Sequence, residues 1–211
     1  MMSESDENGG RQPRLLHKIS REGEMKKSSS SSSETVLYVL VTAHPDDESM
    51  FFLPTIRALQ QQRQRQSRVI FWLLCLTAGN YDGLGSVRTQ ELRRACESLQ
   101  IDKLIFPDCD ENNDENQLDE NLRKSSQKSS RRSEIKDHPH EAWPIAEASH
   151  LIRRALSKAL GEDMRLKEVG QPSCVLMKLI TFDEGGVSGH VNHRDCYYAV
   201  RNFYYEENDS L

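Results

Sequence analysis

An apolar run that ends in an acidic turn limits what this chain can fold into more than any other feature. The run, Thr35–Thr42, is rich in β-branched and aromatic residues, which is typical of a buried β-strand. The turn that follows, Ala43–Glu48, gathers His44, Asp46 and Asp47 around a proline. Open α/β sheets bind their ligands at the carboxyl ends of the strands. The turn is therefore expected to lie at a ligand site.

A second apolar run precedes a glycine-rich loop far along the chain. The run is Cys174–Ile180, and the loop extends from Thr181 to His193. Two histidines, His190 and His193, lie three positions apart at its end. This spacing alone is weak evidence for a metal site. Two histidine-bearing loops at the ends of parallel strands can, however, converge on one ion, which makes the combined pattern much stronger.

Strand-like and helix-like segments alternate along the rest of the sequence. This alternation predicts an α/β protein with a parallel, doubly wound sheet. Pro54 is compatible with a helix if it falls within the first turn. Besides the first run, the strand-like segments are 68–76, 103–106 and 174–181, and the helix-like segments are about 50–60, 86–99, 145–160 and one that begins near Asn192.

Polarity is spread unevenly along the chain. For 211 residues one domain is the default, and a hydrophobic fraction of 36% is low for a fully folded chain. The arm 1–34 ends in a six-serine run, which favours disorder. Residues 108–120 hold seven acidic side chains and 123–136 hold six basic ones. We therefore expect a folded domain at 35–211 that carries a disordered charged insertion at about 108–140, with a lid or a lipid-headgroup contact as the alternative.

Charge and cysteine content narrow the function classes. A net charge of −5 gives no reason to expect nucleic-acid binding. The five cysteines are scattered and form no CxxC pair, so reduced thiols are expected. No apolar run approaches the ~20 residues needed to span a bilayer. Membrane association would therefore require surface contacts, a partner or a segment missing from this chain.

The residues at the two strand ends match the needs of a zinc hydrolase. Catalytic zinc usually takes three protein ligands and keeps one position open, and His44, Asp47 and His193 form such a set. Asp46 is then placed to act as the general base on a water molecule. His190 would face the substrate carbonyl from the other side, stabilising the oxyanion or protonating the departing amine.

Other interpretations of the same residues remain open. The carboxylates of the first turn could simply cap a helix. The glycines of the second loop could cradle a phosphate, although neither a GxGxxG nor a Walker pattern is present. Asp183, at the end of the same strand, could orient a histidine through the second ring nitrogen.

Taken together, these motifs resemble the PIG-L/LmbE-like zinc deacetylase family. The resemblance covers about 35–107 and 141–205. It implies a Rossmann-like three-layer fold with a mostly parallel sheet, and a Zn²⁺ cofactor or another divalent metal. The matching segments are Val41–Phe52, Leu74–Tyr81, Arg88 with Glu91 and Leu92, and Thr181–His193.

The family resemblance also implies roles for individual residues. His44, Asp47 and His193 match the zinc ligands, Asp46 the general base and His190 the acid or electrophilic partner. Arg88 resembles an arginine that contacts the phosphoinositol side of the substrate, and Asp183 is a further substrate-binding candidate.

The same resemblance implies a reaction and a cellular setting. The reaction is removal of the N-acetyl group from GlcNAc-phosphatidylinositol in GPI-anchor biosynthesis, at the cytoplasmic face of the endoplasmic reticulum membrane.

The chain departs from the family pattern in three respects. A serine-rich arm replaces the usual membrane-spanning helix, the charged insertion is longer than expected, and the usual further strand and helices do not follow the last helix. Two alternatives therefore stand beside the glycolipid deacetylase. One is a deacetylase of a soluble N-acetylglucosaminyl conjugate, and the other is a truncated, inactive form or binding module.

Overall fold

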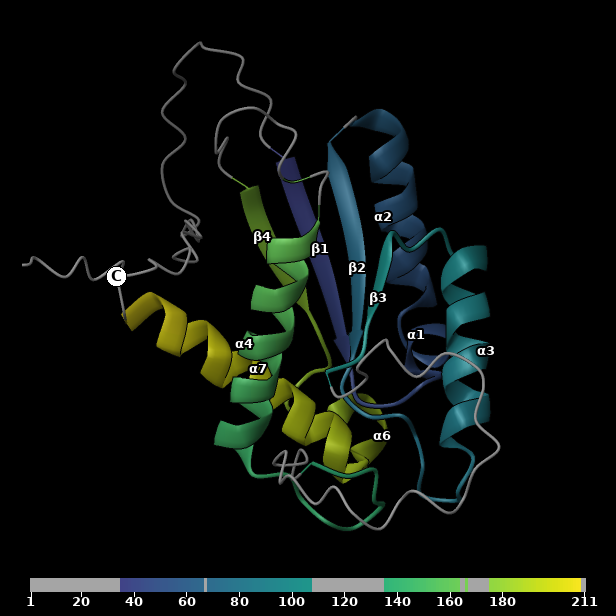
Figure 1. The fold of residues 1–211 in the computed structure, drawn as a ribbon, viewed down its shortest axis with the longest axis vertical. Helices are drawn as coiled ribbons and strands as arrows, with labels where there is room; N and C mark the ends of the chain where they lie inside the picture. Colours follow the sequence, from purple (N-terminus) through teal and green to yellow (C-terminus); the bar gives the residue numbers. More distant parts are fainter. Residues whose placement is uncertain (1–34, 67, 108–134, 164–165, 167–174, 210–211) are drawn as a thin grey trace, which may run out of the picture.

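Four parallel strands form the centre of the molecule. The computed structural model describes residues 35–66, 68–107, 135–163, 166 and 175–209. Within this part of the chain the strands lie in the order β3-β2-β1-β4, and each neighbouring pair is parallel (Figure 1). The predicted α/β class with a parallel sheet is confirmed. The strands are β1 (Thr35–Thr42), β2 (Val69–Cys75), β3 (Lys103–Ile105) and β4 (Val175–Ile180).

Helices cover both faces of the sheet, so the fold has three layers. Figure 1 shows α2 and α3 on one side of the strands and α4 and α7 on the other. This follows from right-handed crossovers, because the chain moves outward from β1 to β3 and then returns past β1 to β4. The helices are α1 (Asp47–Met50), α2 (Leu53–Arg65), α3 (Gly85–Ser98), α4 (Ile145–Glu162), α6 (Gly186–Gly189) and α7 (Val191–Asp209).

The apolar character of β1 and β2 explains their central position. Both strands are buried along almost their whole length, as expected for strands covered on two faces. Trp72 is fully buried at the middle of β2. By contrast, β4 is only half-buried and exposes Lys178, a residue typical of a sheet edge.

The helices largely follow their apolar periodicity. Pro54 lies in the first turn of α2, where its missing N–H is not needed, so this expectation is confirmed. The helix α4 buries one continuous face that includes Ile152 and Leu156. Val87, in the first turn of α3, faces solvent and is 50% exposed.

The charged insertion was expected to extend to about 140. Its last residues, 135–140, are described and pack against the domain. Ile135 is buried in the hydrophobic core, and this contact holds the segment in place. The remainder of the insertion, 108–134, and the arm 1–34 lie outside the described residues.

The sheet has one topological switch point. After β1 the chain enters helices on one face, and after β4 it enters helices on the opposite face. A crevice between the carboxyl ends of two such neighbouring strands is where α/β proteins bind ligands. Both histidine-bearing segments of the sequence begin at these two strand ends.

Candidate active site

The turn after β1 is closed around the carboxylate of Asp47. Its Oδ2 accepts hydrogen bonds from the backbone N–H of Ala43 at 3.0 Å and of His44 at 2.8 Å. Both His44 and Asp47 are buried. Asp46, between them, has the unusual backbone angle φ of 113° and leaves half of its side chain exposed. The turn therefore places two adjacent carboxylates in different environments, one inside and one at the surface.

The loop after β4 delivers His190 and His193. Gly186 has a φ of +69°, and an added Cβ would lie 2.8 Å from the backbone N of Arg194, so only glycine fits there. The Nδ1 of His193 lies 3.0 Å from Ser188 Oγ and 3.2 Å from the carbonyl oxygen of Gly186. The ring of His193 also stacks on a neighbouring phenylalanine at 4.2 Å. These contacts fix the ring and leave Nε2 facing the site.

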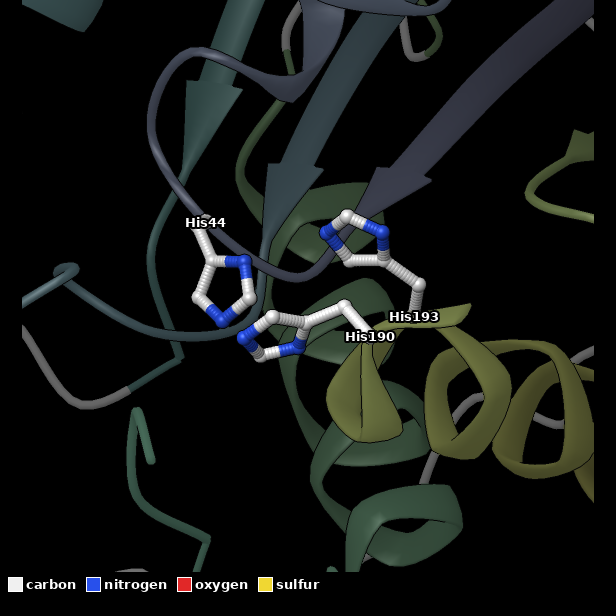
Figure 2. Close-up of side chains that lie close together, drawn as sticks. All are labelled: His44, His190 and His193. Carbon is white, nitrogen blue, oxygen red and sulfur yellow. The ribbon is translucent and has the colours of Figure 1, made fainter. Parts of the chain in front are cut away.

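The two segments bring three imidazoles together. One ring nitrogen each from His44, His190 and His193 lie within 4.8 Å of one another, and Figure 2 shows the three rings turned toward a common centre. The Nε2 of His193 also lies 3.1 Å from Asp47 Oδ1. The predicted metal ligands His44, Asp47 and His193 therefore share one site, and His190 joins them.

The donor set fits a zinc ion or another divalent metal. Imidazole nitrogens and carboxylate oxygens are the ligands that catalytic zinc uses. Metal binding requires neutral imidazole, and the pKa of His190 is lowered by burial and by the neighbouring rings of His44 and His193. The hydrogen bonds to His193 Nδ1 are of the kind that orient a metal-binding histidine through the second ring nitrogen.

Arg88, a predicted substrate residue, reaches into this site from α3. Its Nη2 donates to Asp46 Oδ2 at 2.9 Å and to the carbonyl oxygen of Pro45 at 2.9 Å. Its Nη1 donates to the carbonyl oxygen of Gly79 at 3.1 Å. The guanidinium group therefore lies against the candidate general base.

Asp183 contacts the backbone of its own loop and not the histidine that it was expected to orient. Its Oδ1 accepts from the backbone N–H of Gly185 and of Val187, at 3.0 and 3.1 Å, and the side chain is exposed. It thus stabilises the loop itself. Ser188 and the Gly186 carbonyl occupy the orienting position beside His193.

Two residues at the site were missed in the sequence. Asp137 Oδ1 and Asn192 Oδ1 each lie 3.2 Å from His44 Nε2. Asp137 belongs to the segment assigned to the disordered insertion, and the only local signals were one apolar residue, Ile135, and the polar turn around Pro139. Asn192 lies between the two predicted histidines, and its complete burial marks it only once the fold is known.

Fold and site together define a class: three-layer α/β proteins with a histidine and carboxylate centre at the switch point of a parallel sheet. Comparison with known proteins narrows the class. This chain belongs to the PIG-L family, whose model, described as GlcNAc-PI de-N-acetylase, matches residues 39–204.

Curated relatives agree with this membership. The chain is 35% identical over 166 residues to N-acetylglucosaminyl-phosphatidylinositol de-N-acetylase of Bos taurus, a match that covers 77% of this chain and 48% of the relative. It is 37% identical over 159 residues to a probable enzyme of that name from Schizosaccharomyces pombe, covering 75% and 48%. It is 32% identical to the Saccharomyces cerevisiae protein, covering 77% and 41%. The chain thus spans less than half the length of the relatives it matches.

Among the described residues, every helix is too short or too polar to cross a bilayer.

Proposed function

We propose that this chain carries the catalytic centre of a metal-dependent N-acetylglucosaminyl-phosphatidylinositol de-N-acetylase. The reaction is hydrolysis of the acetamide to give glucosaminyl-phosphatidylinositol and acetate, a step of GPI-anchor biosynthesis. One observation carries the proposal: three imidazoles and the carboxylate of Asp47 meet at the switch point of a PIG-L family domain. Because the substrate is a membrane lipid, the proposal includes peripheral contact with the cytoplasmic face of the endoplasmic reticulum membrane.

The buried residues of the site suit metal binding. We assign His44, Asp47 and His193 as ligands because all three are buried and are held by contacts within their own segments. A bound Zn²⁺ or another divalent ion would act as a Lewis acid on the acetamide and lower the pKa of a water molecule. His190 is only half-buried, which leaves its ring accessible to substrate.

The more exposed residues suit proton handling. Asp46 has a side chain that is 52% exposed and lies next to the ligand Asp47, so it can accept the proton of the attacking water. The neutral ring of His190 can donate a hydrogen bond to the carbonyl oxygen as negative charge develops on it. The amine of glucosamine leaves with the proton that Asp46 accepted, and the acyl group with the remaining hydroxyl forms acetic acid, which ionises to acetate.

A cleft beside this centre can hold the sugar. It has a volume of about 410 Å³, and its lining includes Thr77, Tyr81 and Asp137. Small-molecule sites span about 300–1,000 Å³, so the cleft is large enough for one sugar unit. Asp137 connects the cleft to the metal centre because it also contacts His44.

The test is deacetylation of GlcNAc-phosphatidylinositol by the purified chain, with bound zinc measured in the same samples. We expect activity that a chelator removes and zinc restores. Asp46→Asn should lower kcat by about 10²–10⁴-fold with its metal content unchanged. Glu184→Gln, which neutralises an exposed acid on the second loop, serves as the matched control.

Each other result has a defined meaning. A folded, zinc-loaded chain that ignores the glycolipid but deacetylates a soluble N-acetylglucosaminyl conjugate would replace the substrate assignment. A folded chain that binds no metal would refute the proposed function.

A further inference from the structure

Asp46 has a backbone conformation that it would not adopt by itself. Its φ of 113° is in a region that non-glycine residues rarely occupy, and such strain persists only where the surroundings impose it. We propose that Arg88 and Glu48 are positioning residues that clamp Asp46 in this conformation and aim its carboxylate at the site. The inference builds on the proposed role of Asp46 as general base.

Arg88 holds the side-chain end of Asp46. Its guanidinium group donates to Asp46 Oδ2 and to the carbonyl oxygen of Pro45, the residue just before Asp46. A third hydrogen bond, to the carbonyl oxygen of Gly79, anchors the group to the segment that follows β2. Planar guanidinium binds several oxygens in a fixed geometry, which a lysine ammonium cannot do. Arg88 thus connects the segments that follow β1 and β2.

Gly79 leaves the space that this arrangement requires. A Cβ at Gly79 would lie 2.6 Å from Arg88 Nη1, 2.8 Å from Arg88 Cζ and 2.9 Å from Pro45 Cδ. Any larger residue would therefore displace the guanidinium group. The glycine also has a φ of +67°, so the backbone conformation independently favours it.

Glu48 holds the backbone end of Asp46. Its side chain is 2% exposed, and its Oε2 accepts the backbone N–H of Asp46 at 3.1 Å. Its Oε1 accepts a hydrogen bond from Ser49 Oγ at 2.6 Å. A buried carboxylate needs such partners, and here one of them is the strained residue itself. Both ends of Asp46 are thus fixed by groups that are separate from the proposed metal ligands.

Steady-state kinetics on the full chain separates clamping from substrate binding. If Arg88 positions the base, Arg88→Met should lower kcat by about 10–100-fold while KM and bound zinc change less than about twofold. Glu48→Ala should resemble it, and Glu48→Gln, which keeps an oxygen for the Asp46 N–H, should retain most of kcat. If KM rises for Arg88→Met with kcat unchanged, Arg88 contacts substrate and the proposal is wrong.

A glycine pair tests the same contact without altering a charge. Gly79→Ala should reproduce the kcat loss of Arg88→Met because the new methyl group displaces the guanidinium. Gly83→Ala is the matched control, since Gly83 has a φ of +75° but open space around its missing Cβ. Equal kcat for the two alanine variants would contradict the clamp.

Thermal unfolding tests the clamp independently of catalysis. With Arg88 present, Asp46→Gly should melt above Asp46→Ala by about 2–4 °C, because glycine tolerates the imposed φ. With Arg88→Met added, the turn can relax, so the difference should vanish or reverse as the entropy cost of glycine takes over. An unchanged difference would refute the clamp. If the unsubstituted chain lacks deacetylase activity, the proposed function is wrong. The melting temperatures of the Asp46 variants still decide whether Arg88 clamps Asp46.

Discussion

The two histidine-bearing segments reach the same site but differ in their exposure and in the contacts that stabilise them. Apart from Asp46, the turn after β1 is nearly closed to solvent, since His44, Asp47 and Glu48 are 6%, 2% and 2% exposed. The loop after β4 is open, with Val187 57% exposed and the carboxylate of Asp183 at the surface. The first holds its shape through buried carboxylates that bind backbone N–H groups, and the second through glycine geometry and short side-chain contacts.

This difference indicates how the site can be both ordered and accessible. Buried hydrogen bonds in low-dielectric surroundings are costly to break, so the first turn can hold Asp46 and Asp47 in fixed places. The hydrogen bonds that Asp183 accepts in the second loop are exposed and exchange readily with water, so that part of the loop can adjust when substrate enters. We infer that the first turn provides the rigid half of the site and the second loop the adaptable half.

Removing a carboxylate from each segment gives the largest expected contrast. Asp47 and Asp183 each accept two backbone N–H hydrogen bonds, but only Asp47 is buried. Asp47→Ala should lower the free energy of unfolding by about 3 kcal/mol, because two buried N–H groups lose their acceptor. Asp183→Ala should cost no more than about 1 kcal/mol, because water replaces the carboxylate. Chemical denaturation of the metal-free chain measures both, and equal losses would remove the distinction between the two segments.

Alanine substitutions at two glycines of the second loop, Gly186 and Gly189, should give the next largest difference in stability. A Cβ on Gly186 would lie 2.8 Å from the backbone of Arg194 and 3.0 Å from His193 Cβ, whereas one on Gly189 would meet nothing within 4 Å. Both glycines have positive φ, so both alanine variants carry the same conformational cost. Gly186→Ala should add a further loss of about 1–3 kcal/mol from the steric clash. It should also weaken zinc binding by about 10–100-fold, because it shifts His193.

Denaturation and zinc competition titrations test this pair. If Gly189→Ala weakens zinc binding as much as Gly186→Ala, backbone conformation rather than contact with His193 controls the loop.

The rigid half of the site was largely predictable from the sequence. The burial of β1 follows from its continuous apolar composition, and its neighbour β2 has the same pattern. Strand ends of a parallel sheet share one edge, so the meeting of His44 with His193 could be inferred without coordinates. The fold class and the nearness of the predicted ligands therefore rest on local patterns that the tertiary structure preserves.

The remaining features depend on contacts that no local pattern encodes. Asp137 approaches His44 in a segment that is held by the burial of Ile135 and by hydrogen bonds from Tyr81 and Trp143, and the charged residues before that segment conceal the signal. The hydrogen bonds of Arg88 depend on the positive φ of Asp46 and on the absence of a side chain at Gly79, where the guanidinium group packs. Both are properties of the folded chain, so the sequence alone suggested only a substrate contact for Arg88.

A smaller effect is expected from the hydroxyl of Ser188. Its Oγ lies 3.0 Å from His193 Nδ1, but the Gly186 carbonyl oxygen lies 3.2 Å from the same nitrogen and remains in the variant. Ser188→Ala should therefore weaken zinc binding by less than about tenfold. Ser49→Ala, which removes a hydroxyl from the first turn, is the control and should leave zinc affinity unchanged. A loss above about a hundredfold for Ser188→Ala would show that the carbonyl cannot orient the histidine alone.

The rate of thiol alkylation tests the comparison without any amino-acid substitution. Cys75 donates to the carbonyl oxygen of Thr77, whose side chain binds Ala43 at the start of the first turn. Cys196 contacts Thr181 at the start of the second loop. Burial raises the pKa of the Cys75 thiol well above its usual value and that of Cys196 to about 12, so little thiolate forms at pH 8.

Alkylation of the native chain should therefore be slow at both thiols, with full labelling after denaturation. Peptide mapping by mass spectrometry gives the rate at each site. If the second loop is the adaptable half, its local opening should expose Cys196 before Cys75, and saturation with zinc should narrow the difference because the ion joins the two segments. Faster labelling of Cys75 would instead mean that the turn holding Asp46 opens first, and the rigid and adaptable halves would have to be exchanged.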